Sequence, residues 1–299
     1  RTVQLFDCDL PDGKCYAFCP RTPANYGKMR EILFDVIDIT LEIGALKKFY
    51  LARASNPDLR VRTQHGGTVT ALLEVAMKEG FIDAAIVSGQ NDAMEQEGRL
   101  IEDQSELRRH TKSKFTVSPT VAAFNRLPDG HSKKIGVVAT PCQVTALAKM
   151  RTAKIPGYSK TDALNLVIGL FCGWTLSMER FSRLLADYQL SVGSLEKMDI
   201  PAGKNVLELL TKQGVISVPM TDVDACIRTA CRYCNDSTAE FADLSVGAAR
   251  YGGEGDEMRG WNQVIVRSQR GQDLFELALA GGELEIREVP IHALCELKS

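Results

Sequence analysis

Two hydrophobic patterns alternate along most of this chain. Apolar residues run almost without interruption through four segments that predict buried strands: 49–54, 81–89, 134–140 and 164–171. They recur at steps of three and four residues in segments that predict helices: 24–49, 69–79, 142–150 and 177–187. Because strands and helices follow one another repeatedly, the sequence predicts a layered α/β core.

The two ends of the chain depart from this alternation. Residues 206–218 and 263–266 predict antiparallel strands with glycine turns, and 243–253 predict a glycine-rich loop between strands. Residues 1–25 are rich in Cys, Pro, Asp and Gly, which predicts a loop-like leader. Charged residues dominate 91–114, which predicts a helix or a mobile surface segment. The fold class is therefore α/β (mixed α+β), with an antiparallel C-terminal part and a cysteine-rich N-terminal leader.

Composition and charge exclude some functions. The chain has 299 residues and a formal net charge of −2, so nothing attracts it as a whole to nucleic acid. No apolar run reaches the roughly 18 residues that span a bilayer. The chain opens with Arg-Thr-Val-Gln and shows no signal peptide, so we expect a cytoplasmic protein.

Nine cysteines carry most of the chemical information. Thiols without a secretory leader favour a soft metal centre over disulfides. Cys142 and Cys172 each follow a predicted buried strand, at the sheet edge where ligands bind in layered α/β folds. Cys231 and Cys234 form a Cys-x-x-Cys pair, which can chelate one metal centre. Two alternatives stay open: Cys142 and Cys172 are small core residues, or Cys226 joins Cys231 and Cys234 around a structural zinc ion.

Three further thiols lie in the leader, at Cys8, Cys15 and Cys19-Pro20. A Cys-x3-Cys-Pro run closes the bacterial ferredoxin motif, so these residues predict a second iron–sulfur site. The alternative is three unrelated thiols in a loop.

A glycine pair precedes the helix predicted over 69–79. Gly66 and Gly67 let the backbone approach a phosphate group, and the helix N-terminus at Thr68 favours its charge. Residues 114–118 could add the cation of Lys114 and hydroxyl groups to the same site. A plain tight turn and an ordinary surface loop are the alternatives.

Several phrases occur together and in order. The chain contains Gln64-His-Gly-Gly-Thr-Val-Thr, Lys114-Phe-Thr-Val-Ser-Pro, Ala139-Thr-Pro-Cys-Gln, Gly169-Leu-Phe-Cys-Gly, Ala230-Cys-Arg-Tyr-Cys-Asn-Asp and Val264-Ile-Val-Arg. This order resembles the beta subunit of coenzyme F(420)-reducing hydrogenase and its relatives, over roughly residues 53–290. The chain departs from the family pattern at His65, in the long segment 251–260 and at Cys226.

The resemblance implies a set of cofactors and residues. It implies FAD and a [4Fe-4S] cluster, with a second cluster possible in the leader, and the deazaflavin coenzyme F(420) as substrate. By matching position, Cys142, Cys172, Cys231 and Cys234 are the expected cluster ligands. The segments expected to hold FAD contain Gly66, Gly67, Thr68, Lys114, Thr116 and Ser118. The implied domains are a ferredoxin-type segment at 1–25, a linker helix at 26–52 and a flavin and iron–sulfur oxidoreductase domain at 53–299.

The implied function is electron transfer between a hydride carrier and a partner subunit. FAD would exchange hydride with F(420) and single electrons with the cluster, and electrons would continue to other redox subunits of a hydrogenase, formate dehydrogenase or heterodisulfide-reductase-like complex. One alternative keeps these cofactors but uses NAD(P)H, ferredoxin or an organic acceptor. Another, of a different class, is a zinc-stapled scaffold subunit without redox activity.

Overall fold

A computed structural model describes residues 13–35, 39–40, 43–91, 96–111, 115–153, 155, 158–201, 204–249 and 260–289. Within these ranges an eight-stranded sheet has the order β13-β3-β12-β11-β7-β6-β4-β5. Its strands are Lys48–Ala54 (β3), Ala84–Gln90 (β4), Gln96–Ile101 (β5), Ile135–Ala139 (β6), Leu164–Leu170 (β7), Leu244–Ala248 (β11), Asn262–Val266 (β12) and Leu284–Glu288 (β13). The mixed α/β class is confirmed.

Five strands of this sheet point the same way. β4, β6, β7 and β11 pair in parallel, and β3 shares their direction because β12 runs antiparallel to both β11 and β3. β5, β12 and β13 run the opposite way. The carboxyl ends of the five strands therefore meet at one edge, which we call the carboxyl edge. In such sheets this edge is where ligands bind.

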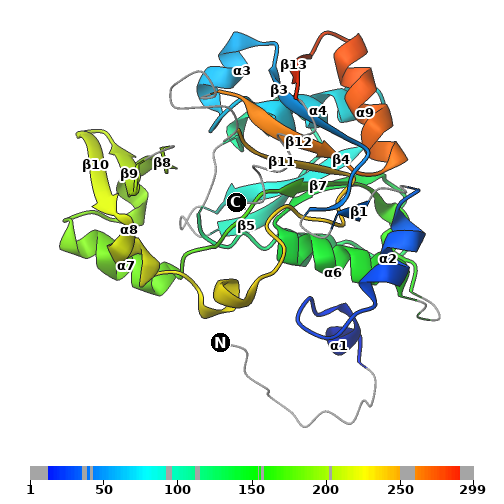
Figure 1. Cartoon of the computed structure of the whole chain (residues 1–299), viewed down its shortest axis with the longest axis horizontal. Helices are drawn as coiled ribbons and strands as arrows, with labels where there is room; N and C mark the ends of the chain where they lie inside the picture. Colours follow the sequence, from blue (N-terminus) through cyan, green and yellow to red (C-terminus); the bar gives the residue numbers. More distant parts are fainter. Residues whose placement is uncertain are drawn as a thin grey trace.

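Helices cover both faces of the sheet (Figure 1). On one face α4 (Thr68–Lys78) and α9 (Gln269–Ala280) bury a core that includes Leu72 and Phe275. On the other, α2 (Tyr26–Leu33), α5 (Thr120–Arg126) and α6 (Pro141–Thr152) bury a core that includes Phe124 and Leu147. Burial of each large apolar side chain stabilises this sandwich by about 1.5–3 kcal/mol. No helix in the described ranges is both long and apolar enough to cross a bilayer.

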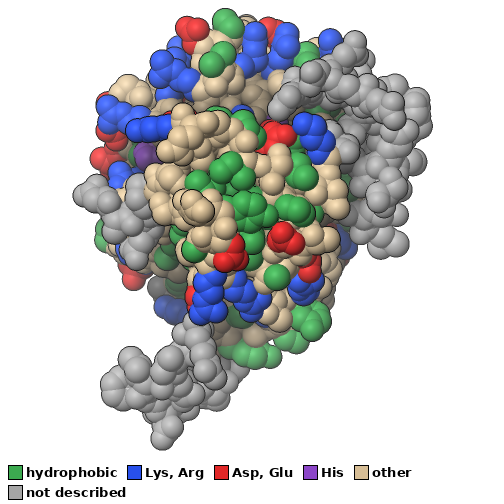
Figure 2. Space-filling model, turned by 90° about the vertical axis from the view of Figure 1, so that its left-hand side faces the viewer, with side chains coloured by type: hydrophobic (Ala, Val, Ile, Leu, Met, Phe, Trp, Pro, Cys, Tyr) green, Lys and Arg blue, Asp and Glu red, His purple; other side chains and the backbone are tan. Residues whose placement is uncertain are grey.

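A smaller antiparallel sheet lies beside the large one, at the left of Figure 1. It contains β8 (Leu195–Asp199), β9 (Val206–Thr211) and β10 (Gly214–Pro219), in the order β10-β9-β8. It packs on α7 (Met178–Asp187) and α8 (Met220–Asp224) around a third core. Figure 2 views the molecule from this side, and hydrophobic side chains gather in the middle of that face.

The remaining α-helices and strands of the described residues are short: α1 (Lys14–Phe18), α3 (Pro57–Arg62), β1 (Ile39–Thr40) and β2 (Gly44–Ala45). Two-residue strands β1 and β2 pair antiparallel with each other. The chain between α2 and the sheet is therefore not the single long helix predicted over 24–49. The predicted domain boundary at residue 53 falls inside β3, which begins at Lys48 and is already part of the sheet.

Two segments fold differently from the prediction. The charged stretch 91–114 contains strand β5 and a short 3₁₀ helix, Gln104–Arg109. β5 lies at the end of the sheet, where strands are half exposed and tolerate charged residues. The glycine-rich stretch after Asp243 begins as strand β11. Its small residues are needed there, because a Cβ at Gly247 would lie 2.2 Å from the Phe171 ring.

Candidate functional site

Two of the predicted ligand thiols lie at the carboxyl edge, as expected. Cys142 follows β6 at the start of α6, where Pro141 occupies the first helical turn. Cys172 follows β7, and its backbone N–H donates to the carbonyl oxygen of Ser237 over 2.9 Å. Cys142 is exposed and Cys172 is half-buried. Because β6 and β7 are adjacent parallel strands, their two thiols emerge at neighbouring positions.

Backbone pairing after β7 brings Cys231 to the same place. Leu176 forms a bridge with Ile227, and the N–H of Arg228 donates to the carbonyl oxygen of Thr175 over 3.0 Å. The Cys231 sulfur in turn accepts the N–H of Thr175 at 3.4 Å. Hydrogen bonds to sulfur of this kind are a feature of iron–sulfur ligands, whose potential they tune.

The four thiols of Cys142, Cys172, Cys231 and Cys234 form one electrostatic group, which we call the thiol group. Burial is the main cause that raises the pKa of the Cys172 thiol to about 12, and negative charge on the other three thiols acts in the same direction. Cys226 stands apart from this group. It is buried in the core beneath the smaller sheet, and its pKa is raised by that burial.

Cysteine thiols of this kind hold either a zinc ion or an iron–sulfur cluster. Among the described residues, no three His, Cys, Asp or Glu side chains lie close enough together to hold one metal ion. A zinc ion holds each sulfur ligand at about 2.3 Å, whereas a [4Fe-4S] cluster separates its thiolates by its own iron and sulfide atoms. The donor set is all sulfur, which is what such clusters use.

The leader thiols of Cys15 and Cys19 lie on a segment that is tied to this region. Lys149, buried on α6, donates through Nζ to the carbonyl oxygen of Cys19 over 2.7 Å and to the Thr22 hydroxyl over 2.6 Å. Arg21 donates through its guanidinium to the carbonyl oxygens of Ala230 and Tyr233. Arg21 therefore ties the leader to the loop that carries Cys231 and Cys234. Cys8, the third predicted leader ligand, lies outside the described residues.

The glycine turn forms a tight cradle at the N-terminus of α4. Gly67 has a φ of +78°, which favours glycine. A Cβ at Gly66 would lie 2.7 Å from Asn262 Oδ1 and 2.9 Å from the carbonyl oxygen of Gly260. The buried Thr68 hydroxyl donates to Asn262 Oδ1 over 2.9 Å, and it also contacts the carbonyl oxygen of Ala52. Its hydrogen bonds are thus made within the protein, and Asn262 is a site residue that sequence reasoning missed.

The second predicted flavin segment contacts both β5 and the chain that follows Cys172. Thr116 is buried and bridges to Leu176, four residues after Cys172. The Ser118 hydroxyl donates to the carbonyl oxygen of Glu97 over 3.0 Å. Gln143, next to Cys142, donates through Nε2 to the carbonyl oxygen of Ser118 over 3.0 Å. Lys114 lies outside the described residues.

Unpaired polar atoms mark the same edge. In the part of the chain that the structure describes, four buried side-chain atoms near the carboxyl edge lack a hydrogen-bond partner: Gln64 Oε1, Ser88 Oγ, Gln96 Oε1 and Gln263 Nε2. Buried polar atoms are normally paired, because leaving one unpaired costs about 1–3 kcal/mol. A polar ligand at this edge would supply the missing partners, and the polar groups of a dinucleotide such as FAD are of the right kind. Gln64 opens the phrase Gln64-His-Gly-Gly-Thr, but no motif in the sequence marks the other three residues.

Comparison with known proteins gives one consistent answer. Residues 49–125 match the N-terminal pattern, and residues 132–291 the C-terminal pattern, of the coenzyme F(420) hydrogenase/dehydrogenase beta subunits. The coenzyme F(420) hydrogenase beta subunit of Methanothermobacter thermautotrophicus is 28% identical over 250 residues, which are 83% of this chain and 86% of that protein. An F(420)H(2) dehydrogenase subunit of Methanosarcina mazei is 30% identical over 257 residues, 83% of this chain and 67% of that protein.

The fold has a solved counterpart as well. A chain from the F(420)-reducing [NiFe] hydrogenase complex of Methanosarcina barkeri superposes with a TM-score of 0.78. The two chains are 24% identical, and the match covers 88% of this chain and 89% of the other. This likeness shows that the two chains share a fold.

Proposed function

This chain belongs to the family of coenzyme F(420) hydrogenase/dehydrogenase beta subunits, which are oxidoreductases. We propose that it is the flavin and iron–sulfur subunit of an F(420)-dependent redox complex. The observation that carries the proposal is the convergence of Cys142, Cys172, Cys231 and Cys234 at the carboxyl edge, where buried polar atoms also lack a partner among the described residues. When bound, FAD would exchange a hydride, two electrons at once, with F(420) and pass single electrons to or from a [4Fe-4S] cluster.

The chain's own residues would hold these groups at neighbouring positions. The four thiolates would bind the cluster, and the Thr175 N–H would stabilise negative charge on the Cys231 sulfur. Gly66 and Gly67 would let the α4 N-terminus approach a phosphate of FAD. The bridges from Thr116 to Leu176 and from Leu176 to Ile227 join the flavin segment to both thiol loops. Lys114, Thr116 and Ser118 stay predicted contacts of FAD.

Electrons would pass between this chain and a partner through the surface where the thiol group is exposed. Cys142 and Cys234 are exposed, and so is the Tyr233 side chain between the two members of the Cys-x-x-Cys pair. The leader, tied to this loop by Arg21, would carry a second cluster on Cys8, Cys15 and Cys19. A partner redox subunit would exchange electrons with this chain from that side.

The test is cofactor analysis of protein purified without oxygen, followed by an assay of the whole complex. We expect about four iron atoms per chain for one cluster, acid-labile sulfide and one FAD. Loss of F(420) absorbance should follow when the complex is given the electron donor of its partner subunit. If the complex reduces NAD(P) and not F(420), the proposed substrate is wrong and the proposed cofactors stand. A colourless protein that contains stoichiometric zinc would refute the proposal and favour a scaffold subunit.

A matched pair of variants tests the ligand assignment. Cys231→Ser should lower iron by about four atoms per chain, one cluster, and leave FAD bound, because serine is a poor ligand for the cluster. Cys226→Ser is the control, since the Cys226 thiol is buried in the core beneath the smaller sheet, and it should keep wild-type iron. Equal iron in both variants would show that Cys231 is not a ligand.

A further inference from the structure

Among the described residues, Arg267 is the most deeply buried charged side chain. It follows β12, and within those residues the acceptors of its hydrogen bonds are all hydroxyl or carbonyl oxygens. Its Nε donates to the Ser245 hydroxyl over 2.7 Å, and Nη1 donates to the carbonyl oxygen of Ala45 over 2.7 Å. Nη2 donates to the Thr238 hydroxyl over 2.9 Å and to the Thr238 carbonyl oxygen over 3.1 Å.

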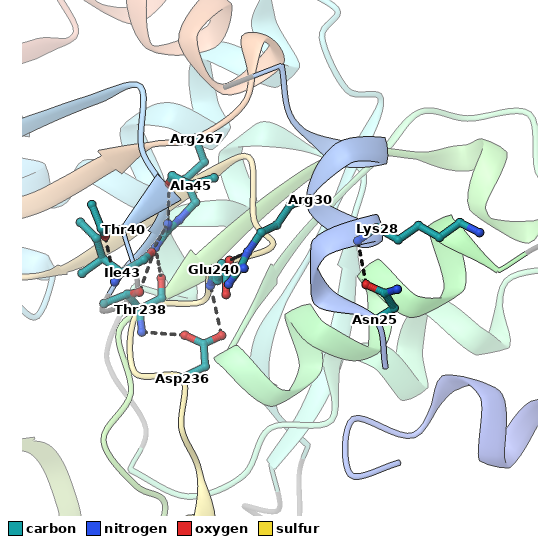
Figure 3. Close-up of polar contacts among 10 residues, drawn as sticks. All are labelled: Asn25, Lys28, Arg30, Thr40, Ile43, Ala45, Asp236, Thr238, Glu240 and Arg267. Atoms are coloured by element: carbon teal, nitrogen blue, oxygen red, sulfur yellow. Dashed lines mark hydrogen bonds and ion pairs between the residues drawn. The ribbon is translucent and has the colours of Figure 1, made fainter. Parts of the chain in front are cut away.

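Removing a guanidinium from water is costly, so its position needs a reason. Methionine or leucine would fill the same space without that cost, and buried ion-like groups of this kind often specify a conformation more than they add stability. The five donors of an arginine form a fixed fork, which can hold several acceptors in one geometry. Here the fork joins β11, the chain at Ala45 and the loop at Thr238 (Figure 3).

That loop, residues 236–240, has a tightly defined shape. The Asp236 carboxylate accepts the backbone N–H of Thr238 over 3.0 Å and that of Glu240 over 3.1 Å. Glu240 forms an ion pair with Arg30 of α2 (Figure 3). Ala239 has a φ of +57°, a left-handed conformation that needs support from its surroundings. The Ser245 hydroxyl supplies some of it by donating to the carbonyl oxygen of Ala239 over 3.1 Å.

The same loop holds two of the four thiols. The Ser237 carbonyl oxygen accepts the backbone N–H of Cys172 at 2.9 Å. The Asp236 carbonyl oxygen lies 3.3 Å from the Cys234 sulfur. The loop therefore contacts Cys172, from the end of β7, and Cys234, from the Cys-x-x-Cys pair, while Arg267 binds it at Thr238. A displacement of the loop would move both thiols together.

We propose that Arg267 is a positioning residue for the thiol group, and that it acts through Thr238 and loop 236–240 on Cys172 and Cys234. The inference rests on the proposed function only where it speaks of a cluster, because the placement of the two thiols is a property of the protein chain. Arg267 donates its hydrogen bonds to Ser245, Thr238 and the chain at 43–45, so its effect on the thiols is indirect.

The test compares Arg267→Lys and Thr238→Val with a matched control. Lysine keeps the charge but has no fork, so it cannot hold Ser245, Ala45 and Thr238 at once. Thr238→Val removes only the hydroxyl that accepts a hydrogen bond from Arg267 Nη2. Thr211→Val is the control, because its buried hydroxyl likewise accepts a hydrogen bond, from the backbone N–H of Gln213, and donates one to the carbonyl oxygen of Gly214 in the β9–β10 hairpin.

Two readouts separate positioning from simple stability. In metal-free protein, mass spectrometry after timed iodoacetamide labelling should show Cys172 reacting at least threefold faster in Arg267→Lys and Thr238→Val than in wild type, with Cys226 unchanged. In iron-loaded protein, the electron paramagnetic resonance spectrum of the reduced cluster should change in both variants. Thr211→Val should lower the thermal midpoint as Thr238→Val does and leave both readouts as in wild type.

Each outcome supports the inference or overturns it. Wild-type labelling rates and spectra in folded Arg267→Lys and Thr238→Val would overturn the inference. If Arg267→Lys does not fold, Thr238→Val alone decides. If wild-type protein takes up no iron, the proposed function fails, and the labelling experiment still tests the positioning of Cys172.

Discussion

Adding one methyl group at Gly169 tests how tightly the thiol group is packed. Gly169 lies in β7, three residues before Cys172, and loop 236–242 packs directly on it. A Cβ at this position would lie 2.3 Å from the Cβ of Ala239 and 3.0 Å from that of Ala242. Carbon atoms in contact are about 3.5–4.0 Å apart, so the loop must move by about 1 Å or more. Overpacking of this kind costs about 1–3 kcal/mol.

Gly173→Ala is a control with the same chemical change. Gly173 follows Cys172 directly, and a Cβ there would meet no atom within 4 Å. It should therefore unfold like wild type. Gly169→Ala should lower the thermal midpoint by about 2–5 °C, which is about 1–3 kcal/mol at the usual size of the melting entropy. It should also lower iron per chain, because loop 236–242 carries the carbonyl groups beside Cys172 and Cys234.

Circular dichroism melts and iron analysis of the three proteins, prepared without oxygen, measure both effects. A Gly169→Ala variant that melts with wild type and keeps full iron would refute the reasoning, because the loop would then yield freely. A loss of stability without a loss of iron would show that the contact is tight but that the thiols do not depend on it.

Three further changes have defined outcomes. Gly66→Ala should reduce FAD retention at least fivefold, since the added Cβ would meet Asn262 Oδ1 and the carbonyl oxygen of Gly260. The assay is the amount of flavin per chain, and an unchanged amount would contradict a close approach of the backbone at Gly66 to FAD. Thr68→Val should lower the free energy of unfolding in urea by about 1–3 kcal/mol, because Asn262 Oδ1 and the carbonyl oxygen of Ala52 lose the hydroxyl they contact. An unchanged unfolding midpoint would be inconsistent with these hydrogen bonds. Lys149→Met should speed proteolysis and hydrogen exchange in residues 13–25, because the ammonium group that holds the leader is lost; unchanged exchange there would speak against this tether.

Local pattern was enough to predict the central elements. The uninterrupted apolar stretches became β6 and β7, because a strand covered on both faces needs apolar side chains on both sides. Helices α4 and α6 formed where a glycine or a proline marks the start and apolar spacing follows it. The positions of Cys142 and Cys172 at the carboxyl edge followed directly, since each is the continuation of a parallel strand.

Other features could not be predicted from sequence, because they depend on residues that are distant in the chain. Strand β5 is charged because it lies at the end of the sheet, and β11 has small residues because Phe171 packs on it. Neither neighbour can be identified from the strand's own residues. The polar atoms of Gln64, Ser88 and Gln263 form a set only after three distant segments meet at one edge. Arg267 ends an apolar strand and gives no hint in sequence that it is buried.

The sequence alone determined which residues could be ligands, since the chemistry of a thiol belongs to its own residue and the strands before Cys142 and Cys172 are predicted from their own apolar residues. The tertiary structure alone decided how the described cysteines come together: Leu176 pairs with Ile227, which brings Cys231 and Cys234 near Cys172, while Cys226 is buried in the core beneath the smaller sheet. The physical reason is that strand pairing joins residues far apart in the chain. Their proximity depends on backbone hydrogen bonds and shared burial, neither of which is a property of any one segment.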